Sequence, residues 1–366
     1  MKVRFNRHEM AEALTAISSV AAGRTPKPIL QCVHIQAKSD AVLLCATDLE
    51  LSVRCAVSQV EVDKTGEAVV VADTLTRIVR ESGDEVLVMD LAKQVLHLRG
   101  QDSHFQMVTR DPADFPPVAG EVEEADFEVD FAVLRRLVDW TVFACAREST
   151  RYAINGVLWA IEGEQLVLVA TDGRRLALAR GAFLPKRAGV TLSVIVPQRA
   201  LTLLSRVPVA PDTSVTVRAT ANQLVLAAGP VVIGTSLVEG HFPRYQDVIP
   251  IDNDKRVALR TGELQSALKR AALLTNEESR GVRMAFSQEG LVLSSRAAEQ
   301  GEATIQVAVE YGGEPLDIGF NPLFLLDVLR VADAEEITLS FKEPSRPGVF
   351  NMGKDFTYVV MPINLS

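Results

Sequence analysis

Aromatic side chains are scarce in this sequence: they make up 5% of its 366 residues, and only two of them are tryptophans. A protein that binds single-stranded nucleic acid by stacking its bases needs exposed aromatic rings, so this composition argues against that class. The net charge is −9 and the pI is near 5.3, so the chain lacks an overall basic surplus. A surface that contacts nucleic acid would therefore have to concentrate its basic groups locally.

Cysteine and histidine are also sparse, which bears on metal binding and catalysis. The four cysteines, Cys32, Cys45, Cys55 and Cys145, form no C-x-x-C pair, so we interpret them as small buried residues of a reducing compartment. The five histidines are scattered, and none lies in an H-E-x-x-H or triad-like context. We therefore expect no metal, no cofactor and no intrinsic catalytic activity.

Long apolar runs are missing as well. Nowhere do about eighteen apolar residues follow one another, and the charged residues at the start of the chain are not followed by an apolar stretch. We expect a cytoplasmic protein without a signal peptide or a membrane span. With 48% hydrophobic and 23% charged residues, the composition is that of an ordinary globular chain, and its length predicts two to four domains.

What the sequence does contain is an internal repeat. Three stretches resemble one another: VHIQAKSDAVLLCATD at Val33–Asp48, VLWAIEGEQLVLVATD at Val157–Asp172 and VRMAFSQEGLVLSSR at Val282–Arg296. They recur at intervals of about 125 residues, which indicates copies of one unit. In each, an alternating apolar run leads through a polar turn into a second β-rich run, the pattern of a hairpin.

Helical patterns flank each hairpin at the same spacing. We predict a helix ahead of each hairpin, over 9–22, 131–146 and 262–274, and a β run leading into a short helix behind it, over 69–79, 194–204 and 318–329. The sequence thus predicts an α+β fold of three repeated domains, each with two helices packed on antiparallel sheets. We place the domains at residues 1–120, 127–248 and 254–366, separated by acidic or proline-rich seams.

Helix geometry limits what three such domains can enclose. If the two helices of every domain line an inner wall, six helices packed about 8–10 Å apart give a circle only about 17 Å across, with almost no hole. Two chains supply twelve helices and an opening of roughly 25 Å, wide enough for a nucleic-acid duplex of about 20 Å. A head-to-tail pair is then the smallest ring that admits a duplex.

The charges are consistent with this arrangement without requiring it. Basic residues slightly outnumber acidic ones in the six helical segments, although the whole chain is negative. A duplex-facing lining and an ordinary solvated helix face explain this bias equally well. A weakly cationic lining would allow sliding, because phosphate contacts set affinity without reading sequence.

Several short sequence motifs together indicate a protein family. The sequence resembles the bacterial β sliding clamps of DNA polymerase III, and the likeness covers the whole chain. It rests on the threefold repeat and on RTPKPIL at 24–30, TDGRRL at 171–176, Asn276-Glu277 with RGVR at 280–283, IGFN at 318–321 and YVVMP at 358–362.

The resemblance implies that the chain is half of a homodimeric, head-to-tail ring around duplex DNA. Such a ring tethers the α subunit of DNA polymerase III and other replication and repair proteins, contacts DNA without sequence specificity, and is opened by an ATP-driven clamp loader. The chain has no G-x-x-x-x-G-K-[ST] motif of its own, which is consistent with a passive, non-catalytic processivity subunit. The alternative is a three-domain peptide-binding scaffold that never encircles DNA.

The resemblance also implies a pocket between the second and third domains for an extended peptide with Leu and Phe anchors. Without the resemblance, Thr171-Asp172-Gly173 would be interpreted as a plain turn. Relatives often carry basic residues where this chain has Asp247 and Asn364. Whether the pocket prefers peptides with acidic or glutamine-bearing flanking residues therefore stays open. The residues carried over to the pocket are Ile154, Thr171, Gly173, Arg175, Leu176, Pro243, Val248, Pro344, Arg346, Val359, Met361, Pro362 and Ile363.

Two further sets of residues follow from the same resemblance. It places Phe105 and Met107 of one subunit against Leu273 and Leu274 of the other, although both residues of the HFQM strand could instead face their own core. Glu148 lies among the DNA-contacting positions where a neutral residue is common, so we assign it no role. The residues expected to contact DNA are Arg24, Arg147, Arg151, Tyr152 and Arg199.

Overall fold

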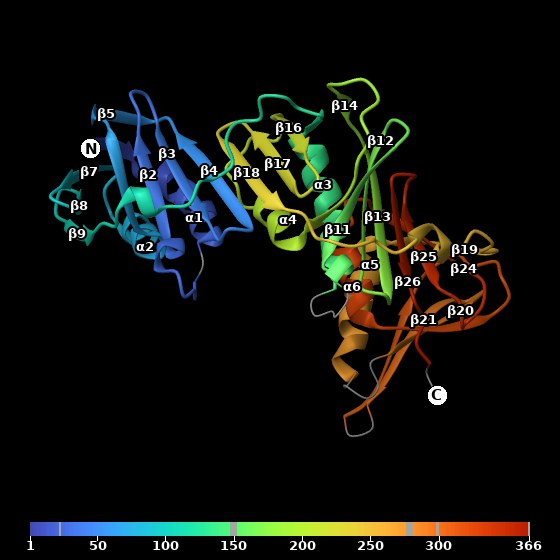
Figure 1. The fold of residues 1–366 in the computed structure, drawn as a ribbon. Coiled ribbons are helices and arrows are strands. Elements are labelled where there is room, and N and C mark those ends of the chain that lie inside the picture. The colour runs from blue at the N-terminus through green and yellow to red at the C-terminus, as the bar shows by residue number, and fades with distance from the viewer. Residues whose placement is uncertain (22, 147–151, 276–280, 298–299, 365–366) are drawn as a thin grey trace. The chain divides into compact units, whose positions relative to one another are not determined.

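The computed structural model describes residues 1–21, 23–146, 152–275, 281–297 and 300–364 (Figure 1). Within these residues each repeat contains two α-helices, an antiparallel hairpin that extends into a third strand, and short 3-10 helices labelled η. The prediction of an α+β fold with three repeated domains, each with two helices and antiparallel sheets, is confirmed.

In repeat one, the first helix follows the strand ahead of the hairpin, and the second helix follows a strand behind the hairpin. Asn6 caps the first helix, since its side chain accepts hydrogen bonds from the backbone N–H groups of His8 and Glu9 at 2.9 and 3.3 Å. The helix therefore starts two residues before the predicted Glu9. The elements are β1 (Lys2–Asn6), α1 (Arg7–Val20), η1 (Pro28–Gln31), β2 (Cys32–Ala37), β3 (Val42–Thr47), β4 (Leu51–Val57), β5 (Val60–Lys64), β6 (Gly66–Val71), α2 (Ala72–Glu81), β7 (Val86–Ala92), β8 (Val95–Arg99), β9 (His104–Val108) and η2 (Pro112–Asp114).

Repeat two follows the same order with a shorter second helix. The predicted helix over 131–146 ends at Thr141 and continues as a 3-10 turn. The elements are β10 (Phe127–Asp130), α3 (Phe131–Thr141), η3 (Val142–Ala144), η4 (Tyr152–Ile154), β11 (Gly156–Glu162), β12 (Gln165–Thr171), β13 (Arg175–Ala182), β14 (Leu184–Pro185), β15 (Ser193–Pro197), α4 (Gln198–Leu204), β16 (Ser214–Ala219), β17 (Gln223–Ala228) and β18 (Val231–Ser236).

Repeat three completes the chain. Asn321 caps its second helix by accepting a hydrogen bond from the N–H of Leu323 at 3.0 Å, and Pro322 occupies the first helical position. The elements are η5 (Tyr245–Val248), which lies in the connection from repeat two, and β19 (Lys255–Arg260), α5 (Thr261–Ala271), η6 (Ala272–Leu274), β20 (Val282–Ser287), β21 (Gly290–Ala297), β22 (Gly301–Val307), β23 (Leu316–Phe320), α6 (Pro322–Val331), β24 (Glu336–Phe341), β25 (Gly348–Met352) and β26 (Phe356–Val360).

The described chain forms two compact units, and repeat two is shared between them. The first unit comprises Met1–Arg135, Phe183–Leu192 and Val196–Leu237, and the second comprises Arg136–Ala182, Ser193–Ile195 and Val238–Ser366. Each unit is therefore built around the boundary between two consecutive repeats.

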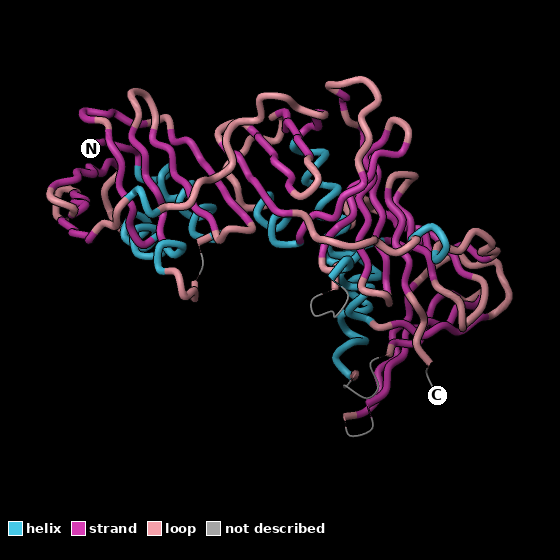
Figure 2. The backbone as a smooth tube through the Cα atoms, in the orientation of Figure 1, coloured by secondary structure: helices cyan, strands magenta, loops and turns pink. Residues whose placement is uncertain are grey.

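A nine-stranded antiparallel sheet organises the first unit, in the order β14-β10-β16-β17-β18-β4-β3-β2-β6. Strand β4 of repeat one pairs with β18 of repeat two, with Ser52 opposite Gly234, and we call this pairing the first junction. Helices α1 and α2 pack together on one face of the repeat-one strands (Figures 1 and 2). A second sheet, β5-β1-β7-β8-β9, ends in the edge strand β9.

An eight-stranded sheet organises the second unit in the same way, in the order β15-β11-β12-β13-β26-β25-β24-β19. Here β13 of repeat two pairs with β26 of repeat three, with Leu176 opposite Val359, and we call this pairing the second junction. The other sheet, β22-β21-β20-β23, ends in the edge strand β22. In both units, a third strand of one repeat thus joins the last strand of the next.

The cores of both units are apolar and contain all four cysteines. Each is free and buried, as the sequence predicts. Burial raises the pKa of Cys45 to about 11 and the pKa values of Cys55 and Cys145 to about 12, because the interior disfavours the thiolate.

These thiols should report on global unfolding. We expect a thiol reagent at pH 8 to label the native protein only as fast as it unfolds, and to label all four cysteines in denaturant. Because the folded-state pKa values exceed the usual value near 9, the contribution of these thiols to stability should be constant below pH 9 and fall as the pH rises toward 12. Rapid labelling of the native protein at pH 8 would contradict this burial.

Candidate functional site

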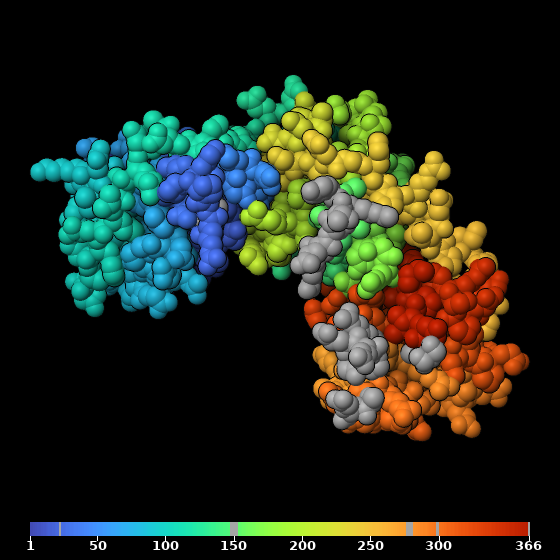
Figure 3. Space-filling view, turned by 60° about the horizontal axis from the view of Figure 1, so that its bottom comes forward, coloured from blue at the N-terminus to red at the C-terminus, as the bar shows by residue number. Residues whose placement is uncertain are grey.

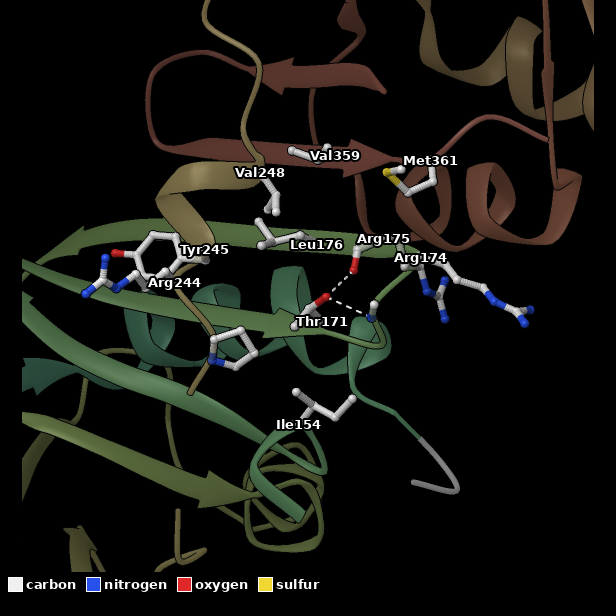
Figure 4. A pocket seen from close by; sticks show the side chains of 12 residues that line it. Ile154, Thr171, Arg174, Arg175, Leu176, Arg244, Tyr245, Val248, Val359 and Met361 are labelled. Atoms are coloured by element: carbon white, nitrogen blue, oxygen red, sulfur yellow. Dashed lines mark hydrogen bonds between the residues drawn. The ribbon is translucent and has the colours of Figure 1, made fainter. Parts of the chain in front are cut away.

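One pocket in the second unit is lined by residues from four separate chain segments. They come from η4, the β12–β13 turn with the start of β13, η5 and the end of β26 (Figure 4). The cavity volume is about 190 Å³. In the space-filling view, green residues of repeat two and red C-terminal residues meet at the surface of this unit (Figure 3). The lining residues are Ile154, Thr171, Gly173, Arg174, Arg175, Leu176, Pro243, Arg244, Tyr245, Val248, Val359 and Met361.

The β12–β13 turn holds one wall of this pocket through its own side chains. The Thr171 hydroxyl donates to the carbonyl of Arg175 at 2.7 Å and accepts from the N–H of Gly173 at 3.0 Å. Asp172 Oδ1 accepts from the N–H groups of Arg174 and Arg175. Gly173 has a φ of +84°, which favours glycine. The TDG sequence therefore specifies a closed turn with its backbone polar groups satisfied.

Arg175 fixes this turn to repeat three. Its guanidinium donates to Asp172 Oδ2 at 3.0 Å and to Asp327 Oδ2 of α6 at 2.7 Å, and it also donates to the carbonyl of Phe143 at 2.9 Å. It stacks 4.4 Å from the ring centroid of Phe324. Arg175 is only 7% exposed, so it serves as a positioned internal cation and offers little surface to a ligand.

The pocket floor is apolar because it is the second junction itself. Leu176 and Val359 are opposite one another in the β13–β26 pairing and belong to a buried apolar cluster with Tyr245. The Tyr245 hydroxyl donates to Glu162, and burial, followed by this bond, raises the pKa of Tyr245. Val248 and Met361 remain 51% and 44% exposed at the rim. These are unusually accessible apolar groups beside a formed cavity.

Two cations lie at the edges of this apolar floor. Arg174 and Arg244 are both exposed and both line the pocket, and Figure 4 shows them at opposite sides of the view with the apolar side chains between them. A ligand with apolar anchors and negative charge at its flanks would therefore complement this surface.

At the first junction, the corresponding positions carry small residues that the connecting segment covers. Ser52 and Gly234 hold the positions of Leu176 and Val359, and Ala119 of the connecting segment lies over them. The N–H of Ala119 donates to the Ser52 hydroxyl at 3.4 Å, and a Cβ on Gly234 would lie 2.5 Å from the Ala119 Cβ. The Arg54–Glu121 ion pair, at 2.9 Å, holds the same segment down. The pocket is thus a property of the second junction's larger side chains.

Sequence profiles of one family match the chain from end to end. The N-terminal, central and C-terminal domains of the DNA polymerase III beta subunit match residues 1–119, 128–244 and 246–364. The beta sliding clamp of Escherichia coli strain K12 is 32% identical over 372 residues, with 100% of both chains covered. The chain belongs to the DNA polymerase III β subunit family, the β sliding clamps.

Solved structures of sliding clamps have the same fold. The DNA polymerase III subunit beta of Pseudomonas aeruginosa matches with a TM-score of 0.90 at 31% identity, and both chains are fully covered. A sliding clamp from the same organism bound to griselimycin gives 0.92 at 31% identity with full coverage. The sliding clamp of Bacillus subtilis gives 0.91 at 25% identity, over 100% of this chain and 99% of that one.

Most of the residues that the clamp resemblance assigned to the pocket lie together. Arg346 instead pairs with Asp252 at 2.9 Å, and the N–H of Ile363 donates to the carbonyl of Gly319. Pro344 and Pro362 are also outside the lining set. Peptide binding by any of these residues stays a prediction. Those that line the cavity are Ile154, Thr171, Gly173, Arg175, Leu176, Pro243, Val248, Val359 and Met361.

Sequence reasoning missed Arg174, Arg244 and Tyr245, which also line the pocket. Arg174 and Arg244 are direct neighbours of assigned residues, and Tyr245 lies two residues after the assigned Pro243, so proximity in the TDGRRL and HFPRY strings was the available signal. The motif alone could not tell which of two consecutive arginines is buried and which is exposed.

The residues predicted to contact DNA are only partly within the described chain. Arg24 is exposed, and Arg199 is 62% exposed by its side chain and pairs with Asp48 at 2.6 Å. Arg147 and Arg151, like Glu148, lie outside the described residues. Tyr152 opens η4, and only its backbone is described. The assignment of these residues to DNA stays a prediction.

The four predicted interface residues differ in accessibility. Phe105 is 37% exposed on the edge strand β9, whereas Met107 on the same face is only 8% exposed. Leu273 is 74% exposed on η6, and Leu274 is half-buried. Val108, which the prediction omitted, is 82% exposed. An apolar surface therefore exists on both edges, although Met107 contributes little to it, and contact with a second subunit stays a prediction.

The described residues contain no group of three or more histidine, cysteine, aspartate or glutamate side chains arranged to hold a metal ion. Among the helices of the described chain, none is long and apolar enough to cross a membrane. As a sliding clamp, the chain is a non-catalytic processivity factor.

Replacing Arg175 tests whether the turn network supports the pocket. Arg175→Met would leave Asp172 and Asp327 without their shared cation, so we expect the free energy of unfolding to fall by about 3 kcal/mol in urea denaturation. The matched control Arg174→Met removes an exposed arginine one residue away and should change stability by less than about 0.5 kcal/mol. Equal effects of the two substitutions would show that the buried network does not stabilise this turn.

Proposed function

We propose that two copies of this chain join head to tail into a ring that encircles duplex DNA and tethers DNA polymerase III and other replication and repair proteins. In this role the protein works in the cytoplasm, without a cofactor, and a clamp loader opens it. The three domains, at residues 1–120, 127–248 and 254–366, each supply two helices to the ring. Family membership supports this role. One structural observation supports the head-to-tail assembly.

That observation is the repetition of the junction. β4 pairs with β18 between repeats one and two, and β13 pairs with β26 between repeats two and three. The corresponding strands still at a sheet edge are β22, the third strand of repeat three, and β9, the last strand of repeat one. An open edge presents a row of backbone donors and acceptors, which a second chain can pair with. A second copy supplies the matching edge at both ends, and this closes the assembly with two equivalent interfaces.

The side chains near these two edges favour that pairing. Phe105 and Val108 are exposed on β9, and Leu273 is exposed on η6, which contacts β21 and β22. Covering these groups removes apolar surface from water, and each buried methylene contributes about 0.8 kcal/mol. The backbone ladder and these apolar contacts would together hold the ring closed.

In this proposal the DNA passes through the ring, and this topological link retains the protein on DNA without tight binding. Arg24 and Arg199 are exposed cations suited to phosphate contact. The pairing of Arg199 with Asp48 reduces its net positive field, which favours sliding over tight binding. The whole chain carries a net charge of −9, so the basic residues that line the ring attract DNA only locally.

The pocket of the second junction would hold a short extended peptide of each partner. Its apolar floor accepts aliphatic and aromatic anchors, and Arg174 and Arg244 at its edges favour carboxylates in the flanking positions. Asp247 is exposed but lies outside the lining set, so it does not cancel these two cations at the cavity.

Topological retention tests the ring directly. After loading with clamp loader and ATP, the protein should remain on a closed circular duplex and leave when the circle is cut once. Blocking the ends of the linear duplex with bulky proteins should restore retention. Equal loss from closed and cut circles would support the scaffold that does not encircle DNA.

Truncating an apolar residue of the rim or the floor tests the pocket. Met361→Ala or Leu176→Ala should weaken binding of a labelled peptide with Leu and Phe anchors by about 1 kcal/mol or more, measured by fluorescence anisotropy. The control Ile251→Ala removes an apolar side chain that is 98% exposed in the same unit and outside the lining set, so it should leave the affinity unchanged. Unchanged affinity in both pocket variants would show that the peptide binds elsewhere.

A further inference from the structure

Both junctions within the chain carry an ionic contact between a hairpin turn and a helix of the next repeat. At the first junction, Asp48 in the β3–β4 turn pairs with Arg199 of α4 at 2.6 Å. At the second junction, Asp172 in the β12–β13 turn binds Arg175, which in turn pairs with Asp327 of α6 at 2.7 Å. At the first junction the turn and the helix thus carry opposite charges, whereas at the second junction an arginine of β13 bridges an acidic turn residue and an acidic helix residue.

A buried hydroxyl fixes the equivalent position in repeat three. Thr47, Thr171 and Ser295 are 3%, 8% and 6% exposed, and each occupies the same place near the end of the second hairpin strand. The next residue is Asp48 in repeat one and Asp172 in repeat two, but it is Arg296 in repeat three. The residue after the hydroxyl, an acidic turn residue in repeats one and two, is therefore a basic residue of strand β21 in repeat three.

The helix that would face this turn shows the opposite change. Arg199 is the second residue of α4, and the second residue of α2 is Asp73. Repeat one is the repeat whose edge strand β9 remains open for another chain. The basic position of the helix has therefore become acidic at the other open end.

We propose that Arg296 of one copy forms an ion pair with Asp73 of a second copy at each interface of the ring, with the polarity of the first junction reversed. This inference rests on the proposed head-to-tail assembly and identifies charges that specify it. Both groups are accessible in the single chain, with side chains 79% and 74% exposed.

Their present contacts do not prevent this pairing. Arg296 pairs with Glu302 at 3.1 Å, and Asp73 pairs with Arg77 at 2.8 Å. These are exposed pairs, which typically contribute little to stability. Rearrangement toward an interface that excludes water would therefore cost little.

The reversal also distinguishes correct from incorrect neighbours. Arg296 facing Arg199 of α4 would be repelled, and so would Asp48 facing Asp73 of α2. The open end of repeat three is thus matched to repeat one of another copy and mismatched to repeat two. Complementary charges of this kind set specificity and association rate more than total affinity.

Charge reversal with mixing tests the pair. Asp73→Arg and Arg296→Asp alone each place like charges at both interfaces, so we expect each dimer to dissociate at least tenfold more readily in sedimentation velocity at low salt. An equimolar mixture of the two variants should recover dimers, because only the mixed dimer has opposite charges at both interfaces. The double variant should also recover. The control Glu61→Arg, on β5 at the opposite edge of the β9 sheet, should dimerise like the unaltered protein.

The outcomes separate this inference from the function on which it depends. If both single variants dimerise like the control, the ion pair is absent, while the ring stands provided Phe105→Arg gives a monomer. If each variant is weakened but the mixture does not recover, the two residues do not face each other. If the unaltered protein is monomeric and leaves closed circles as readily as cut ones, the proposed ring itself fails.

Discussion

Backbone pairing between the third strand of one repeat and the last strand of the next is the interaction on which this molecule depends. It joins β4 to β18 and β13 to β26, and it builds one continuous sheet across each boundary between repeats. A chain with three repeats makes two such pairings and leaves one edge of each kind. Unpaired edges are a liability that proteins usually cover or block. A ring of two copies turns this liability into the interface that function requires.

The pocket of the second unit is a consequence of the same pairing. Leu176 and Val359 face each other across the second junction, and Arg175 ties the adjacent turn to α6. At the first junction, small residues at the same positions allow Ala119 to close the space. A single backbone arrangement therefore gives a covered strand pair in one place and an open pocket in another. The difference lies in the size of two side chains and in the path of the connecting segment.

The repeat, the fold class and the order of elements could be predicted from the sequence, because hydrophobic periodicity is local and recurs three times. Most of the pocket followed from the resemblance, since TDGRRL and YVVMP mark the two strands of the second junction. What could not be predicted depends on tertiary contacts. Alternation places Phe105 and Met107 on one face of β9, but only packing shows that Met107 is buried and Val108 is accessible. Likewise, the burial of Arg175 beside the exposed Arg174 follows from the position of Asp327 on a distant helix.

Hydrogen exchange of the edge strands tests the central claim most directly. The amides of β9 and β22 that are not bonded to β8 or β21 should be protected at concentrations where two copies associate. They should lose that protection on dilution to the single chain, while β4 and β18 stay protected throughout. Fast exchange of these edge amides at every concentration, with β4 and β18 still protected, would contradict the account.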